Sequence, residues 1–146
     1  MKKALLIILA TLLVGCTAHN VQLYSKVDHS NKTVTVPPGS RGLKGKLKQA
    51  LTQEGWKLAV DRGPSVTEGR LGRDTRIKQY STFNTRYRLI TLYRQYDYCF
   101  DFTPAINYEI SFIDNYSGSE VFTIDGSGCE SAVVEKFKNT LKGIDK

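Results

Sequence analysis

Apolar and polar residues alternate in five stretches of the chain, and this period of two predicts β-strands. Two stretches, residues 32–36 and 56–60, come early in the chain. Three more follow one another closely: residues 86–102, 108–112 and 121–124. The segments between these last three are rich in residues that favour turns, such as Pro104 and Gly118, so we expect a three-stranded meander there.

The strand at residues 86–102 has one set of alternating positions that is apolar except for Arg94. We expect this set to face the core, and its members are Ile90, Leu92, Tyr96, Tyr98, Phe100 and Phe102. Tyrosines and arginines interleave here, as in a platform that stacks on nucleic-acid bases. Aromatic residues in strands ordinarily pack in the core and against neighbouring strands, so we expect packing rather than base binding.

Two other stretches have the helical period. In residues 41–54, apolar residues recur at intervals of four, seven and eight, at Leu43, Leu47, Ala50 and Leu51. Ser40 is a suitable N-cap and Gly55 a suitable C-cap, while Gly42 and Gly45 each weaken the helix by about 1 kcal/mol. A second helix is predicted after Ser127, which forms a capping-box pattern with Glu130, and its apolar stripe is Val133, Val134, Phe137 and Leu141.

The order of elements is therefore strand, helix, strand, long loop, three strands and helix. This order predicts an α+β fold with an antiparallel-rich sheet of about four to five strands and two helices packed on one face. Residues 32–146 make one domain.

The long loop, residues 61–85, has widely spaced apolar residues and several glycines. A loop of this length in a compact domain is uncommon and is usually functional or disordered. It is basic, and the candidate residues for binding a partner are Arg62, Arg70, Arg73, Arg76 and Lys78. Either the loop binds an anionic partner, or it is an irregular connection whose charges keep it soluble. Residues 76–80 also have the pattern of an edge strand.

The N-terminus has the pattern of an export signal. Lys2 and Lys3 precede an apolar run over residues 4–14, which ends in Gly15 and Cys16. The run is about half the 20 residues that a transmembrane helix needs. Residues 13–16, Leu-Val-Gly-Cys, resemble the lipobox of bacterial lipoproteins.

This resemblance implies that the chain is cleaved before Cys16 and that Cys16 is acylated on sulfur and on its new amino group. Lipoproteins retained in the inner membrane commonly carry Asp at the next position, so Thr17 implies the outer membrane, with the domain facing the periplasm. The resemblance makes residues 1–15 a signal peptide. The polar residues that follow have no sustained period, and we interpret residues 16–31 as a lipidated tether.

The formal charge of the 146-residue chain is +7, from 21 basic and 14 acidic residues. Removing Lys2 and Lys3 with the signal leaves 19 basic residues and about +5. A moderately basic surface favours anionic partners such as lipid headgroups, cell-wall polymers or acidic proteins. An exported chain rarely meets nucleic acid, so we expect no nucleic-acid partner.

Beyond the lipobox, Cys99 and Cys129 remain, and an oxidising periplasm favours a disulfide between them. Two free thiols or a metal pair are the alternatives, and the second is disfavoured because no other Cys or His has ligand spacing. A meander that turns near Pro104 places Cys99 opposite Ile110. The bridge then requires the chain to fold back at residues 126–128.

No constellation of catalytic residues is present in the sequence. His19 and His29 fall in the predicted tether, where neither is held beside a substrate. The carboxylates of Asp97, Asp101 and Glu109 lie on polar strand faces and are most simply solvated. We therefore expect a protein that is not an enzyme and holds no cofactor or metal.

Two local patterns resemble small periplasmic accessory lipoproteins of the curli-secretion and penicillin-binding-protein-activator type. One is the helix that ends in Gly55-Trp56 before a strand, and the other is the hairpin of residues 110–128. Together with the predicted lipid anchor and the lack of a catalytic constellation, this leads us to expect a non-enzymatic binding or assembly accessory of the cell envelope with a protein partner. The alternatives are a binder of an anionic envelope polymer, such as lipopolysaccharide or peptidoglycan, and a protective inhibitor of a toxin or lytic enzyme.

Overall fold

The computed structural model describes residues 18–62, 66–71, 75–80 and 84–143. The predicted signal peptide and the predicted acylation site, Cys16, lie outside these residues, as does Arg73. Within the described ranges, no helix combines the length and the apolar character that crossing a bilayer requires.

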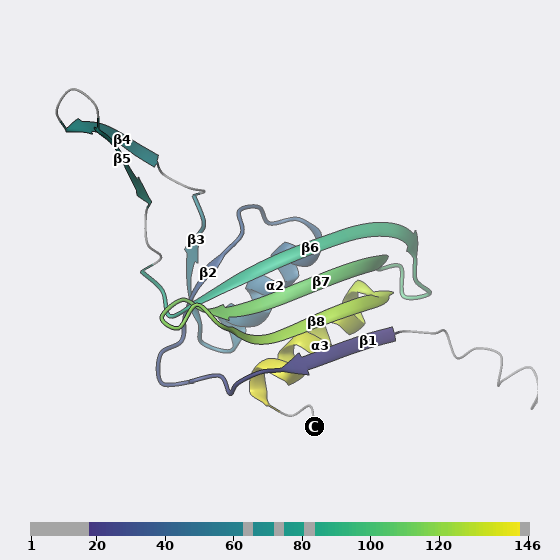
Figure 1. The fold of residues 1–146 in the computed structure, drawn as a ribbon. Coiled ribbons are helices and arrows are strands. Elements are labelled where there is room, and N and C mark those ends of the chain that lie inside the picture. The colour runs from purple at the N-terminus through teal and green to yellow at the C-terminus, as the bar shows by residue number, and fades with distance from the viewer. Residues whose placement is uncertain (1–17, 63–65, 72–74, 81–83, 144–146) are drawn as a thin grey trace, which may run out of the picture.

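The centre of the fold is a mixed six-stranded sheet with the strand order β1-β8-β7-β6-β2-β3 (Figure 1). Its strands, in chain order, are β1 (Ala18–Leu23), β2 (Thr33–Val36), β3 (Lys57–Val60), β6 (Tyr87–Tyr98), β7 (Pro104–Asp114) and β8 (Glu120–Cys129). β2 runs parallel to both of its neighbours, and the other pairs are antiparallel. The predicted α+β class is confirmed, with a sheet that has six strands and mixed direction.

Two helices, α2 (Gly42–Gln53) and α3 (Glu130–Lys142), lie on the same side of this sheet (Figure 1). Both bury the apolar stripes that their periodicity predicts, and the fully buried members are Leu43, Leu47, Ala50, Leu51, Val133, Phe137 and Leu141. The predicted starts are wrong by one or two residues, because the N-caps are Arg41 and Cys129. Ser127 belongs to β8 and does not cap α3.

Stacked aromatic rings form the centre of the core between sheet and helices. Phe112 of β7 stacks on Tyr87 with a centroid distance of 4.9 Å and on Phe122 with 5.1 Å. Trp56, just before β3, meets Tyr87 and Phe112 with its ring nearly perpendicular to theirs. All four side chains are buried, so this stack ties β6, β7, β8 and the β3 side of the sheet together.

Residues 18–23 form an edge strand, so the prediction of a polar tether over residues 16–31 is wrong for this stretch. β1 pairs antiparallel with β8, and Ala18 lies opposite Ser127. The close approach requires Gly126, whose φ is +145° and where a Cβ atom would collide with the carbonyl oxygen of Ala18. The ordered sheet therefore begins two residues after Cys16.

The predicted core face of β6 is also wrong. The buried side chains are Tyr87, Leu89 and Thr91, on the opposite set of positions, whereas Leu92 is 63% exposed. The pairing register shifts between Gln95 and Asp97, which marks a β-bulge. Apolar content misleads here because the aromatic residues gather in the second half of the strand, where the side chains are exposed.

Part of the predicted long loop is a hairpin. β4 (Val66–Leu71) and β5 (Thr75–Tyr80) pair antiparallel as a separate two-stranded sheet. The predicted edge strand at residues 76–80 coincides with β5, although it pairs with β4 and not with the main sheet. Figure 1 shows this hairpin projecting from the end of the molecule opposite to the one where β1 begins.

Candidate functional site

A disulfide joins Cys99 and Cys129 at the end of the sheet where β1 begins. The predicted pairing is confirmed, with a Cα–Cα distance of 5.8 Å. The predicted route is wrong. Tyr98 pairs with Pro104, and Ala105 pairs with Cys129, so the turn comes before Pro104 and β8 runs straight through residues 126–128.

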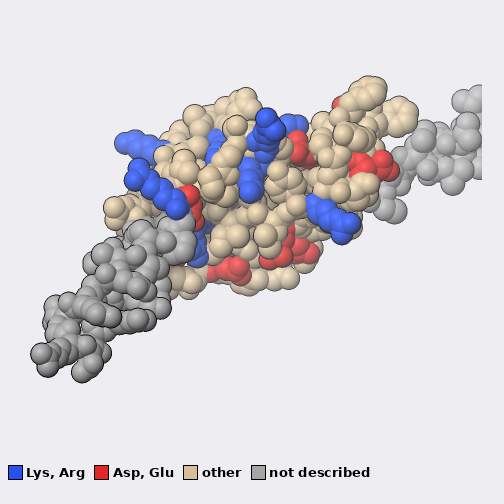
Figure 2. Space-filling view, turned by 90° about the horizontal axis from the view of Figure 1, so that it is seen from above, with Lys and Arg blue, Asp and Glu red and all other residues tan. Residues whose placement is uncertain are grey.

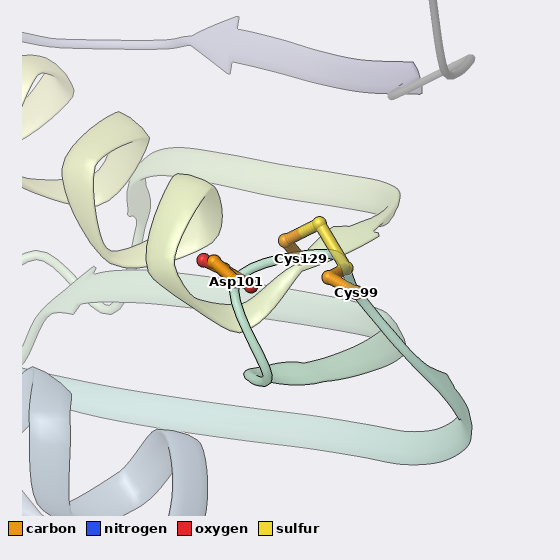
Figure 3. Close-up of side chains that lie close together, drawn as sticks. All are labelled: Cys99, Asp101 and Cys129. Carbon is orange, nitrogen blue, oxygen red and sulfur yellow. A yellow bond between two sulfur atoms is a disulfide. The ribbon is translucent and has the colours of Figure 1, made fainter. Parts of the chain in front are cut away.

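Asp101 lies beside this disulfide, and Figure 3 shows the three side chains together. One ligand-type atom from each of Cys99, Asp101 and Cys129 lies within 4.8 Å of the others. A metal would need thiolates, but the two sulfur atoms are bonded to each other. The carboxylate of Asp101 accepts hydrogen bonds from the hydroxyls of Ser131 and Thr103, each at 2.6 Å. The cluster therefore fixes the β6–β7 turn to the start of α3.

The hydrogen bonds from Ser131 and then Thr103 lower the pKa of Asp101 from 3.8 to about 2. A carboxyl whose pKa is lower in the folded than in the unfolded chain stabilises the fold above its unfolded pKa. We therefore expect Asp101→Asn to be less stable than the wild type near neutral pH. This difference should shrink as the pH falls from about 4 to about 2.

Urea unfolding of the two proteins between pH 2 and 7 measures this difference. Ser131→Ala removes the largest cause of the pKa shift. The difference in stability between this variant and the wild type should shrink over the same pH range and be smaller than the difference for Asp101→Asn. Stability curves of wild type and Asp101→Asn that stay parallel over this range would contradict the assignment.

The same end of the sheet carries four exposed aromatic residues, which we call the aromatic tip: Tyr96, Tyr98, Phe100 and Phe102. Phe100 is 101% exposed and Phe102 is 90% exposed. Phe102 also has a φ of +60°, which is rare for a bulky residue. The sequence analysis placed these side chains in the core, and the structure places them in solvent.

His19, which the sequence analysis placed in a tether, lies on β1 and contacts Tyr108 of β7. Both residues pair with Gly126 of the intervening strand, so the side chains meet over a glycine, with His19 Nδ1 2.6 Å from the Tyr108 hydroxyl. Burial, and then Lys136, lowers the pKa of His19. Burial, and then Asp125, raises the pKa of Tyr108 to about 12. This contact fastens β1 to the sheet.

Glu130 is a buried acid that the sequence analysis treated only as a capping residue. It is 2% exposed at the first position of α3, and its Oε1 lies 2.7 Å from Nζ of Lys46 on α2. Among the described residues, its Oε2 has no hydrogen-bond partner. The ion pair links the two helices, and its only sequence signal was the capping pattern.

The candidate residues of the basic loop are only partly brought together. Arg70 lies opposite Arg76 in the hairpin, and Lys78 lies opposite Glu68. Arg62 is exposed ahead of the hairpin. On the body of the molecule, Figure 2 shows Lys and Arg side chains in separate groups with Asp and Glu near them. The hairpin is thus the place where the chain concentrates the predicted basic residues.

A groove of about 550 Å³ lies between the β1–β2 connection and the end of α3. Leu23, Phe122 and Leu141 supply apolar walls, and Lys26 and Lys142 are the charged lining residues. Lys142 pairs with Glu54 at 2.8 Å. The groove therefore offers mainly apolar surface, and Ser25, His29 and Thr140 are its uncharged polar lining residues.

No protein-family model matches the chain, and no curated protein is similar to it. The solved structures that are similar include two forms of one dodecamer. The PelC dodecamer from Paraburkholderia phytofirmans is 14% identical, with 85% of this chain and 94% of that chain covered and a TM-score of 0.49. A single-substitution variant of that dodecamer is 15% identical, with 81% and 90% covered and a TM-score of 0.47. At these values the likeness assigns neither a family nor a function to this chain.

Proposed function

We propose that this chain is a lipoprotein of the outer membrane whose domain faces the periplasm and acts as a non-enzymatic binding or assembly accessory of the cell envelope. Acylation at Cys16 attaches it to the membrane, and the β4–β5 hairpin binds an envelope protein. The proposal includes no cofactor and no metal. Its sequence basis is the lipobox-like stretch at residues 13–16 together with Thr17.

The observation that carries this proposal is the placement of the two ends of the molecule. β1 starts at Ala18, so one residue, Thr17, separates it from Cys16, and the step from Cys16 to Ala18 spans at most about 7 Å. The hairpin projects from the opposite end (Figure 1). The 12 residues of β6 alone cover about 40 Å along the sheet. A lipid at Cys16 therefore holds one end of the domain at the membrane and presents the hairpin away from it.

The hairpin is suited to an acidic partner. Residues 66–80 contain four basic side chains and two acidic ones, Glu68 and Asp74, a net charge of +2. Surface charge pairs each contribute roughly 0.2 to 1 kcal/mol. Such a surface gives salt-sensitive binding of moderate strength, which fits an assembly accessory better than a permanent complex.

Removing three arginines of the hairpin should therefore weaken partner binding. We expect the variant Arg70→Ala, Arg73→Ala, Arg76→Ala to recover about tenfold less of its crosslinked partner from intact cells, because three charge pairs contribute about 0.6 to 3 kcal/mol. The measurement is quantitative mass spectrometry of proteins crosslinked to the tagged full-length chain.

The matched control removes three charges from the body of the domain: Lys26→Ala, Lys44→Ala, Lys57→Ala. This variant should recover the partner as the wild type does. Equal recovery by the arginine variant would exclude the hairpin as the binding surface. Salt-sensitive binding to purified lipopolysaccharide or peptidoglycan, with no protein present, would favour the polymer-binding alternative.

A further inference from the structure

We propose that the aromatic tip inserts into the lipid interface beside the acyl anchor, so that the domain contacts the membrane at two points. This proposal rests on the proposed acylation of Cys16. It adds a second membrane contact, made by Tyr96, Tyr98, Phe100 and Phe102, and thereby an orientation of the domain.

The exposure of these side chains is the first argument. Four aromatic residues within seven positions are 57% to 101% exposed, and the two phenylalanines are almost completely in solvent. Single exposed apolar residues are normal, whereas a gathered apolar surface marks an interaction site. The tip therefore presents apolar surface that the fold of the chain does not cover.

The position of the tip identifies what covers it. Ala18 pairs with Ser127, two residues before Cys129, and Cys129 is bonded to Cys99 within the tip's own turn. Figure 1 shows the start of β1 and the β6–β7 turn at the same end of the sheet. Because only Thr17 separates Cys16 from Ala18, a lipid on Cys16 brings this end to the bilayer surface. The lipid interface is then the apolar environment nearest to the tip.

The composition of the tip fits an interface. Tyrosine is amphipathic and is enriched where hydrocarbon meets water, and phenylalanine contributes a purely apolar ring. Tyr96 and Tyr98 precede the two phenylalanines, which lie in the turn itself. Acyl chains on both the sulfur and the amino group of Cys16 already give stable attachment, so the second apolar contact adds a fixed orientation of the domain.

The turn holds the two phenylalanines outward before any membrane is met. The backbone N–H of Cys99 donates to the carbonyl of Thr103 at 2.8 Å, and the N–H of Phe102 donates to the carbonyl of Cys99 at 3.0 Å. The disulfide closes the base of the turn. A loop already ordered in its binding conformation loses less entropy on binding.

The one carboxylate between the two phenylalanines is directed away from the lipid. Asp101 accepts hydrogen bonds from Ser131 on α3 and from Thr103, so its charge stays at the protein surface. Phe102, the residue after Asp101, has a backbone φ of +60°. A backbone conformation of this kind in a bulky residue supports a functional role of the turn.

Fluorescence quenching by lipid tests the proposal directly. The full chain, purified from membranes, is reconstituted into vesicles of phosphatidylethanolamine and phosphatidylglycerol with or without brominated acyl chains. Tryptophan is placed in the tip by Phe100→Trp. The control is Tyr116→Trp, at a 68% exposed position in the β7–β8 turn at the opposite end of the sheet. The native Trp56 is buried and gives both variants the same background.

We expect the brominated chains to quench the added emission of Phe100→Trp about threefold or more and to leave Tyr116→Trp unchanged. The proposal would be overturned if the brominated chains quenched Phe100→Trp no more than Tyr116→Trp and iodide quenched Phe100→Trp from the water. Protection of Phe100→Trp from both quenchers would overturn it in favour of a second copy of the chain as the cover.

The mass of the N-terminal peptide separates this proposal from the anchor. If Cys16 is acylated but the brominated chains do not quench the tip, the insertion of the tip is refuted and the proposed anchor stands. An unmodified Cys16 refutes the proposed anchor, whatever the tip does.

Discussion

Phe112→Ala is expected to lower the free energy of unfolding by about 3 to 5 kcal/mol. The ring is completely buried, stacked between Tyr87 and Phe122, and met edge-on by Trp56. Its removal leaves a cavity at the junction of β6, β7 and β8, and it also removes aromatic contacts worth roughly 0.5 to 1.5 kcal/mol each. Urea denaturation followed by far-UV circular dichroism measures the loss.

Phe100→Ala is the matched control, because it makes the same chemical change at a side chain in full solvent. It should alter the free energy of unfolding by no more than about 0.5 kcal/mol. Equal losses in the two variants would mean that the stack around Phe112 is not the centre of the core, or that Phe100 is covered by the chain itself.

The helices were predictable because their signal is local. The stripe from Leu43 to Leu51 repeats with the helical period, and Gly55 follows the helix with a φ of +80°. Gly45, which propensity alone counts against the helix, is needed because a Cβ atom there would collide with the carbonyl of Ser40. That requirement depends on the backbone path by which the chain enters α2, and the hydrophobic period of the helix does not contain it.

The inward face of β6 was not predictable from apolar content. The core takes only Tyr87, Leu89 and Thr91 from this strand, and Leu92 on the opposite face is exposed. A bulge after Gln95 then shifts the register. Counting apolar residues over the whole stretch gave most weight to the aromatic tip, which belongs to a surface. The wrong prediction and the proposed membrane contact therefore have the same origin: these side chains are apolar for a reason other than the core.

Strand β1 and the disulfide depend on pairings between distant parts of the chain. In residues 18–23 the apolar residues, Ala18, Val21 and Leu23, do not alternate regularly with polar ones, and only Val21 and His19 are partly buried, so no local pattern predicts a strand. The partnership of Cys99 and Cys129 could be inferred from the cysteine count. Its route could not, because it depends on where the β6–β7 turn begins, and the turn starts five residues before Pro104.

Because β1 is part of the sheet, an anchor at Cys16 would restrict how far the domain can move from the membrane. A tether of some 15 residues lets a domain move over tens of ångströms, whereas the proposed anchor, joined to a strand that begins at Ala18, would keep one end of the sheet at the membrane. Figure 1 shows the hairpin at the end of the molecule opposite to the start of β1, so the proposed anchor and aromatic tip would lie at one end and the hairpin at the other.

Replacing both bridged cysteines, Cys99→Ser and Cys129→Ser, is expected to lower the free energy of unfolding by about 3 to 4 kcal/mol. The two residues are 30 positions apart, and closing a loop of this length removes that much conformational freedom from the unfolded chain in the chain-entropy model. Urea unfolding of the wild type should show the same loss when a reductant is present, and the double variant should not respond to the reductant.

The wild type should also contain no titratable thiol at Cys99 or Cys129 after unfolding without reductant. Two free thiols, or a loss of stability below about 1 kcal/mol, would contradict the role of the bridge. Because the disulfide closes the turn that carries Phe100 and Phe102, hydrogen exchange at these amides should become faster in the double variant under native conditions. The amides around Phe112 should keep exchanging only through global unfolding, since the core stack does not depend on the bridge for its contacts.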